Sequence, residues 1–132
     1  MELIKRGRRL RGSSIIRGLT RETRISTKSL IYPLFIQEGQ GIMAPIPTLE
    51  NQYYYSSDTV GKIIDESLKV GVSSFMLFGI PKEKDSLGTF AYREDGVVQK
   101  ALRAIKEAYG DSVNIITDVV YVVIWSMVIV VF

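Results

Sequence analysis

The side chains in this sequence that could carry chemistry are carboxylates and amines, because the chain contains no cysteine and no histidine. Histidine is the usual general base near neutral pH, and cysteine and histidine are common zinc ligands. A serine–histidine–aspartate triad and a thiolate or imidazole zinc site are therefore excluded for these 132 residues. The lack of cysteine also excludes disulfide bonds.

Asp118 is the carboxylate with the most informative position. It follows Val113–Thr117, an apolar run typical of a buried strand, and it precedes fourteen residues without a charge, 119–132. A carboxylate at the carboxyl end of a strand could orient an amine or assist proton transfer. An aspartate in this position also commonly caps a turn, so these residues alone leave both roles open.

Short apolar runs alternate with amphipathic helical patterns before this point. We predict strands at 30–36, 73–78 and 113–117, and loops at 38–58 and 79–95. Asp58 is expected to cap a helix that ends at Gly71, and Asp95–Gly96 opens a second helix that ends at Gly110. The helix positions expected to be buried are Val60, Ile63, Ile64 and Leu68, and then Val97, Val98, Ala101, Leu102, Ile105 and Ala108.

The order of these elements is the βαβ pattern of an α/β protein with a parallel sheet. Doubly wound sheets and (β/α)8 barrels both use it, and both bind ligands at the carboxyl ends of their strands. Phe78–Gly79 and Asp118 would therefore point toward a site. The tyrosines at 53–55 are expected to cover one end of the core. Three strands cannot close a barrel, so the pattern indicates part of a larger unit.

Positive charge is concentrated at the start of the chain, although the net charge is only +3. A basic arm can bind nucleic acid phosphates or an anionic membrane. This one lacks interleaved aromatic residues and a binding motif, which favours a solvated arm or one that contacts another subunit. No apolar stretch of a secretory signal follows the basic residues, so a cytoplasmic protein is expected. The basic residues are Lys5, Arg6, Arg8, Arg9, Arg11, Arg17, Arg21 and Arg24.

The uncharged run 119–132 is the candidate membrane segment of this sequence. A helix needs about 20 apolar residues to cross a bilayer, which is more than this run provides. Its many β-branched residues favour a strand over a helix. One hypothesis is nevertheless a small non-enzymatic α/β protein that uses this run as a C-terminal hydrophobic anchor.

A series of short motifs occurs in order along the chain. The motifs are Arg8-Arg9-Leu10-Arg11, Arg21-Glu22-Thr23, Leu30-Ile31-Tyr32-Pro33-Leu34-Phe35, Glu38-Gly39, Pro45-Ile46-Pro47, Leu77-Phe78-Gly79-Ile80-Pro81, Lys84-Asp85, Ala91-Tyr92, Asp95-Gly96, Gln99-Lys100-Ala101 and Ile116-Thr117-Asp118-Val119. In their order and spacing they resemble the N-terminal part of the porphobilinogen synthase family, also called delta-aminolevulinic acid dehydratase. The resemblance covers about residues 8–119 and implies the N-terminal portion of a (β/α)8 TIM barrel, preceded by an extended basic arm. The implied parts are the arm at 1–28, the first βα units at 29–119, and an aberrant apolar tail at 120–132.

The resemblance also implies a lyase that condenses two molecules of 5-aminolevulinate into porphobilinogen, for tetrapyrrole and haem biosynthesis. Two lysines of the family form Schiff bases with the substrate, and both lie beyond the end of this chain. By resemblance, Asp118 is an active-site carboxylate, and the arm contacts a neighbouring subunit, usually in a homo-octamer. The 132-residue chain is expected to be inactive, and neither nucleic acid nor a membrane is an expected partner.

In zinc-dependent members of the family, Thr-Asp-Val is followed by Cys-Leu-Cys and, after four residues, by His-Gly-His-Cys-Gly. The positions of the three zinc-binding cysteines are occupied here by Val120, Val122 and Val130, which cannot bind a metal. The intact protein is expected to use zinc, with magnesium left open as an alternative.

Loss of one base explains this replacement. When a TGT cysteine codon loses its first T and a T follows, the frame reads GTT, valine. In the same frame, leucine becomes Tyr121 and the two histidines become Met127 and Ile129. The tail therefore has the sequence expected of an out-of-frame zinc-binding segment.

Overall fold

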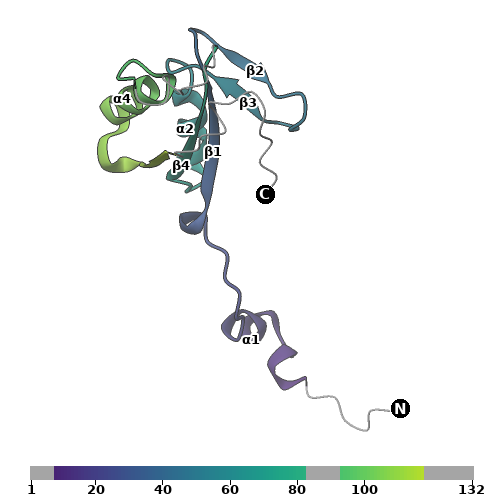
Figure 1. Cartoon of the computed structure of the whole chain (residues 1–132). Helices are drawn as coiled ribbons and strands as arrows, with labels where there is room; N and C mark the ends of the chain where they lie inside the picture. Colours follow the sequence, from purple (N-terminus) through teal and green to yellow (C-terminus); the bar gives the residue numbers. More distant parts are fainter. Residues whose placement is uncertain (1–7, 83–92, 118–132) are drawn as a thin grey trace.

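The computed structural model of the chain describes residues 8–82 and 93–117. Within these ranges, the strands form one sheet in the order β2-β3-β1-β4-β5, and the helices α2 and α4 pack on it (Figure 1). The strands are β1 (Ile31–Gln37), β2 (Met43–Pro45), β3 (Tyr53–Tyr55), β4 (Ser74–Ile80) and β5 (Asn114–Thr117), and the α-helices are α1 (Ser14–Leu19), α2 (Gly61–Lys69) and α4 (Val97–Tyr109). Short 3-10 turns lie at Arg9–Arg11, Thr27–Ser29 and Gly110–Ser112.

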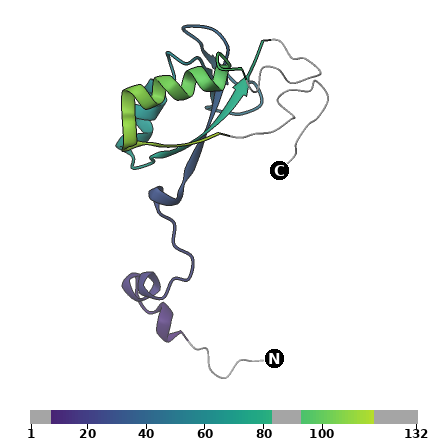
Figure 2. The same cartoon turned by 60° about the vertical axis from the view of Figure 1, so that its left-hand side comes forward.

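The central strands are parallel, as the βαβ pattern predicts. β1 pairs with β4 from Ile31↔Ser74 to Gln37↔Ile80, and β4 pairs with β5 in the same direction. Helix α2 precedes β4 and helix α4 connects β4 to β5. Figure 2 shows both helices on the same side of the sheet. Right-handed crossovers place successive helices on one face when the strands are added in one direction, as β1, β4 and β5 are here.

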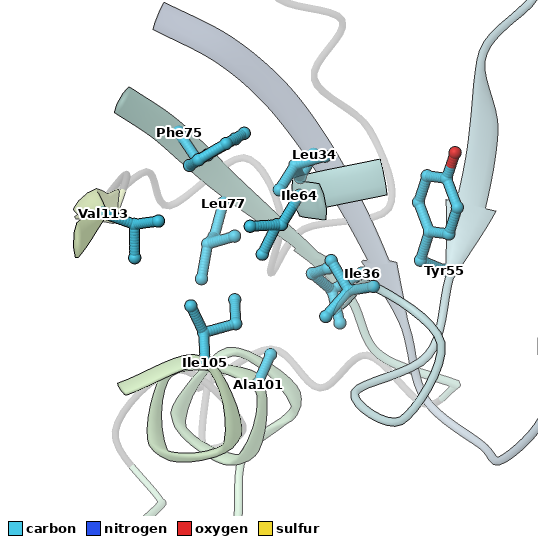
Figure 3. Packing of buried hydrophobic residues seen from close by; sticks show 10 residues of the cluster. Leu34, Ile36, Tyr55, Ile64, Phe75, Leu77, Ala101, Ile105 and Val113 are labelled. Carbon is cyan, nitrogen blue, oxygen red and sulfur yellow. The ribbon is translucent and has the colours of Figure 1, made fainter. Parts of the chain in front are cut away.

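The core lies between this face of the sheet and the two helices (Figure 3). Alternate residues of β1 and β4 point into it, because successive side chains of a strand face opposite sides. Full burial of an aliphatic or aromatic side chain of this size contributes roughly 1.5–3 kcal/mol. The buried cluster comprises Leu34, Ile36, Tyr55, Val60, Ile64, Phe75, Leu77, Ala101, Ile105 and Val113.

The predicted helix faces are largely confirmed. At α2, the buried residues are Val60 and Ile64, and Ile63 and Leu68 pack against the cluster. In α4, the buried residues are Ala101 and Ile105, and Val97 and Val98 pack against the cluster. Leu102 is half-buried. The prediction for Ala108 is wrong, because this residue is exposed. Tyr109, four residues after Ile105, packs against the core in its place, since residues four apart share a helix face.

The prediction of an unbroken loop at 38–58 is wrong, because this stretch contains β2 and β3. Tyr54 pairs with Phe35 and Tyr55 with Ile36 in a parallel ladder, and β2 adds to β3 in the antiparallel direction. Strands of three residues are too short to show a hydrophobic period. Tyr55 belongs to the core cluster and Tyr53 packs against it, as expected. Tyr54 differs from the expectation, because its ring meets Phe35.

Asp58 does not cap α2, contrary to the prediction. A turn separates it from the helix, and the N-cap residue is Val60, which makes no side-chain cap. The Asp58 carboxylate instead accepts a hydrogen bond from the Gly41 amide at 2.9 Å. The predicted helix ends are confirmed by positive φ angles at Gly71 and Gly110, of +87° and +54°, which glycine adopts without steric cost.

The N-terminal stretch lies away from the sheet (Figure 1). From residue 8 to residue 30, every side chain is exposed except that of Ser13, which is half-buried. Several large apolar side chains are among the exposed ones, namely Leu10, Ile15, Ile16, Leu19, Ile25 and Leu30. In the part of the chain that the structure describes, no helix combines the length and the apolar character needed to span a membrane. The run 119–132 lies outside these residues.

Candidate functional site

The carboxyl ends of β1, β4 and β5 define the candidate site. These strands are parallel neighbours and end at Gln37, Ile80 and Thr117. Loops that follow such strand ends carry the binding sites of α/β sheets and barrels. Asp118 comes directly after Thr117, but it lies outside the described residues, so its catalytic role stays a prediction.

An aromatic cluster lies on the face of the sheet opposite the core, close to this edge. Phe35 and Phe78 are partners in the β1–β4 ladder, and their rings stack with centroids 5.5 Å apart. Tyr54 meets Phe35 edge-on at 6.4 Å. All three side chains are half-buried, and aromatic pairs of this kind contribute about 0.5–1.5 kcal/mol beyond their burial. They give the second face of the sheet an apolar wall.

Gly79, which was expected to point toward the site together with Phe78, belongs to the other face. A Cβ atom on Gly79 would lie 2.5 Å from Val98 Cγ2 and 3.0 Å from Val97 Cγ1. The first turn of α4 therefore packs directly on the strand, and only glycine leaves room for it. The structure thus separates the two residues, because side chains alternate along β4: Phe78 can face a ligand, whereas Gly79 supports the helix.

The loop that leaves β1 is held by a buried polar network. Ile42 donates its amide hydrogen to Ser56 Oγ at 2.9 Å, and the Thr59 hydroxyl donates to the Ile42 carbonyl. Ser56 is completely buried. The pKa of Asp58 is lowered chiefly by a hydrogen bond from the Ser56 side chain and, to a smaller extent, by one from the Gly41 amide. These hydrogen bonds to the loop therefore favour the ionised form of the carboxylate.

Glu38, for which local sequence patterns predict no role, joins the exits of β1 and β4. Its backbone amide donates to the Ile80 carbonyl at 3.3 Å. Its carboxylate oxygen Oε2 accepts a hydrogen bond from the Lys82 amide at 3.2 Å. Its position close after a predicted strand was the one feature of the sequence that could have pointed to Glu38. Its hydrogen bond to a residue 44 positions away leaves no trace in local periodicity.

The residues present do not fit a zinc ion. The whole chain lacks cysteine and histidine, and the described residues contain no group of three acidic side chains that could hold a metal. Val120, Val122 and Val130 lie outside the described residues. No chemical step is therefore assigned to a metal bound by the described residues.

The parallel βαβ sheet, with its candidate site at the carboxyl edge, defines the chain as an α/β protein, and the similarity to a solved structure identifies it as part of a (β/α)8 barrel. One solved structure that resembles the chain is delta-aminolevulinic acid dehydratase (porphobilinogen synthase) from Toxoplasma gondii ME49, crystallised with the reaction product porphobilinogen. The TM-score is 0.79 at 32% sequence identity, and the match covers 87% of this chain and 33% of that one.

This chain belongs to the delta-aminolevulinic acid dehydratase family, whose profile matches residues 4–123. The enzyme of that name from Ruminiclostridium josui is 50% identical over 117 residues, which are 89% of this chain and 57% of the relative. The one from Halalkalibacterium halodurans is 43% identical over 114 residues, 86% of this chain and 34% of the relative. The chain thus spans between a third and somewhat more than half of the length of these relatives.

Proposed function

We propose that this chain is the N-terminal part of a porphobilinogen synthase, a lyase that condenses two molecules of 5-aminolevulinate in haem biosynthesis. The observation that carries the proposal is the family match over residues 4–123. The structural match to an enzyme that holds porphobilinogen agrees with it. A cytoplasmic location follows from the same proposal, and membership of the family argues against the alternative of a non-enzymatic anchored protein.

The described residues act in this proposal as a scaffold. They place the exits of β1, β4 and β5 at one edge, with the ring of Phe78 on the face opposite the core. Asp118, the next residue after β5, is proposed to orient a substrate amine or to assist proton transfer. The lysines that form Schiff bases are proposed to lie outside these 132 residues, and this chain alone is therefore proposed to be inactive.

The uncharged tail is proposed to be an out-of-frame reading of a zinc-binding segment. The family match ends at residue 123, inside the uncharged run 119–132, and this supports the proposal. Resequencing the DNA that encodes residues 118–132 tests it. We expect the alternative frame to encode Cys-Leu-Cys and His-Gly-His-Cys; any other reading would remove the basis for zinc and would leave magnesium as the metal to examine.

Genetic complementation tests the activity. A gene with the lost base restored after codon 119, whose product we call the frame-continued enzyme, is expected to rescue a bacterial strain that lacks porphobilinogen synthase. The gene for the 132-residue chain is not expected to do so. A porphobilinogen assay on both purified proteins provides the matched comparison. Turnover by the 132-residue chain would show that residues beyond it are not required.

The N-terminal arm is proposed to bind a second copy of the chain. We propose a division into an arm at 1–28, βα units at 29–119 and the tail at 120–132. Residues 1–28 contain nine lysines and arginines and two glutamates, a net charge of +7, whereas the remainder contains eight basic and twelve acidic residues, a net charge of −4. This complementarity and the exposed apolar side chains of the arm favour assembly into a homo-oligomer.

A further inference from the structure

We propose that Glu38 is a positioning residue that fixes the point at which the chain leaves β4, at the carboxyl edge of the sheet. We call the hydrogen bond between the Glu38 carboxylate and the Lys82 amide the clamp, and it follows from the geometry of the described residues. Its consequence for catalysis rests on the proposed function, because only that function makes this edge of the sheet an active site.

The clamp begins where the ladder between β1 and β4 ends. The last register pair is Gln37 and Ile80, and the Glu38 amide still donates to the Ile80 carbonyl at 3.3 Å. In a parallel ladder every second residue turns its N–H toward a given neighbour, so the next amide that faces β1 after Ile80 is that of Lys82. This amide donates to Oε2 of Glu38 at 3.2 Å. A side-chain oxygen of Glu38 therefore receives the first amide beyond the last register pair.

Glu38 is itself held in place on both sides. Before it, β1 is paired with β4 along its whole length. After it, Gly39 and Gly41 adopt positive φ angles, and the Gly41 amide is bound to the Asp58 carboxylate at 2.9 Å. The Glu38 side chain is half-buried. A carboxylate on such a fixed base can determine the path of a neighbouring chain, whereas one on a freely moving loop cannot.

The charge of the same carboxylate also acts on Arg93. Asp95 forms a two-pronged ion pair with Arg93, with both N···O distances 2.9 Å. This hydrogen bonding and the charge of Asp95 raise the pKa of Arg93 most, and the charge of Glu38 adds to the increase. Besides its hydrogen bond to the Lys82 amide, Glu38 thus contributes a favourable charge toward Arg93.

Amide hydrogen exchange measured by NMR tests the clamp directly. We compare Glu38→Ala and Glu38→Gln with the unchanged 132-residue chain, each fused to a solubility partner. Loss of the acceptor in E38A is expected to speed exchange of the Lys82 amide about fivefold, the effect of one typical hydrogen bond. E38Q keeps an acceptor oxygen and is expected to stay within about twofold. Glu50→Ala, at an exposed carboxylate, is the control and should change nothing at Lys82.

Two outcomes would overturn the clamp: an unchanged Lys82 amide in E38A, or equal acceleration of the core amides of Phe75 and Leu77, which would indicate general destabilisation. The catalytic consequence has a separate readout in the frame-continued enzyme, where E38A should lower kcat/KM severalfold and E38Q should restore most of it. An unchanged kcat/KM would refute the positioning role. Failure of the proposed function would appear differently, as an absence of turnover before any substitution at Glu38.

Discussion

The hydroxyl group of Tyr109 lies 2.8 Å from carboxylate oxygen Oδ1 of Asp65, and it also reaches the carbonyl oxygen of Gly61 at 2.9 Å. It joins the last residue of α4 to the first turns of α2. A Cβ atom on Gly61 would lie 3.2 Å from this hydroxyl, so the glycine lets the two helices approach. Both helices cover the same face of the sheet, and this contact holds them together at the surface of the core.

Replacement of Tyr109 by phenylalanine should therefore destabilise the fold while keeping the ring in place. Loss of a typical hydrogen bond lowers the free energy of unfolding by about 1 kcal/mol, which urea denaturation can resolve. Tyr54→Phe is the matched control, because Tyr54 contacts Phe35 through its ring. Equal stability of Y109F and the unchanged chain would show that the helices are held by apolar packing alone.

Alkaline pH should destabilise the fold through two tyrosines. Burial raises the pKa of Tyr55 to about 12, and burial followed by the hydrogen bond and charge of Asp65 raises that of Tyr109 to about 12. The folded state thus binds these two protons more tightly than the unfolded state, in which the tyrosine pKa has its ordinary value of 10.0. The stabilisation is complete below pH 10 and is lost as the pH rises through 12. Tyrosinate absorbance should include late titration by Tyr55 and Tyr109, and Tyr55→Phe should remove one late-titrating group.

Replacement of Gly79 by alanine should push the first turn of α4 away from β4. The added methyl group would lie 2.5 Å from Val98 Cγ2, and overpacking of this kind costs about 1–3 kcal/mol. Gly18→Ala is the control, because a Cβ at Gly18 meets nothing within 4 Å. Thermal unfolding should show a lower Tm for G79A alone, and Val98→Ala in the same chain should recover part of the loss. Equal Tm values for G79A and G18A would contradict the close contact.

Charges on the apolar side chains of the arm should weaken self-association. Ile15 and Leu19 are 81% and 76% exposed and lie four residues apart in α1, on one side of the helix. The double variant Ile15→Glu, Leu19→Glu should form smaller assemblies in light scattering after size-exclusion chromatography. Val70→Glu, at a residue of the body that is 66% exposed, is the control. An unchanged assembly in the double variant would argue that the arm does not bind a second copy.

Asp118→Asn should lower kcat in the frame-continued enzyme. Loss of a group that transfers a proton typically costs a factor of about 10²–10⁴. Asp111→Asn is a matched control, because Asp111 is exposed and its carboxylate lies 3.9 Å from Lys106 Nζ. A pH–rate profile should lose one limb in D118N. A D118N enzyme with normal kcat would leave Asp118 with the capping role that the residues alone also allowed.

Much of the α/β framework could be predicted from local patterns. The apolar runs that became β1, β4 and β5 and the buried faces of α2 and α4 follow from periodicity, since burial on one side repeats every two or 3.6 residues. The glycines at the helix ends were equally informative because the backbone there needs positive φ angles. The family resemblance came from ordered motifs spread along the chain and agrees with the profile match.

The sequence by itself therefore determined the class of fold, the family, and the positions of the main strands and helices. Tertiary structure alone decided that β2 and β3 extend the sheet, that Asp58 binds Gly41 rather than capping a helix, and that Glu38 meets Lys82. These outcomes share one physical reason. Each depends on a partner from another segment of the chain, and the two hydrogen bonds join residues 17 and 44 positions apart. Such pairings form only when the folded sheet brings the chain segments together.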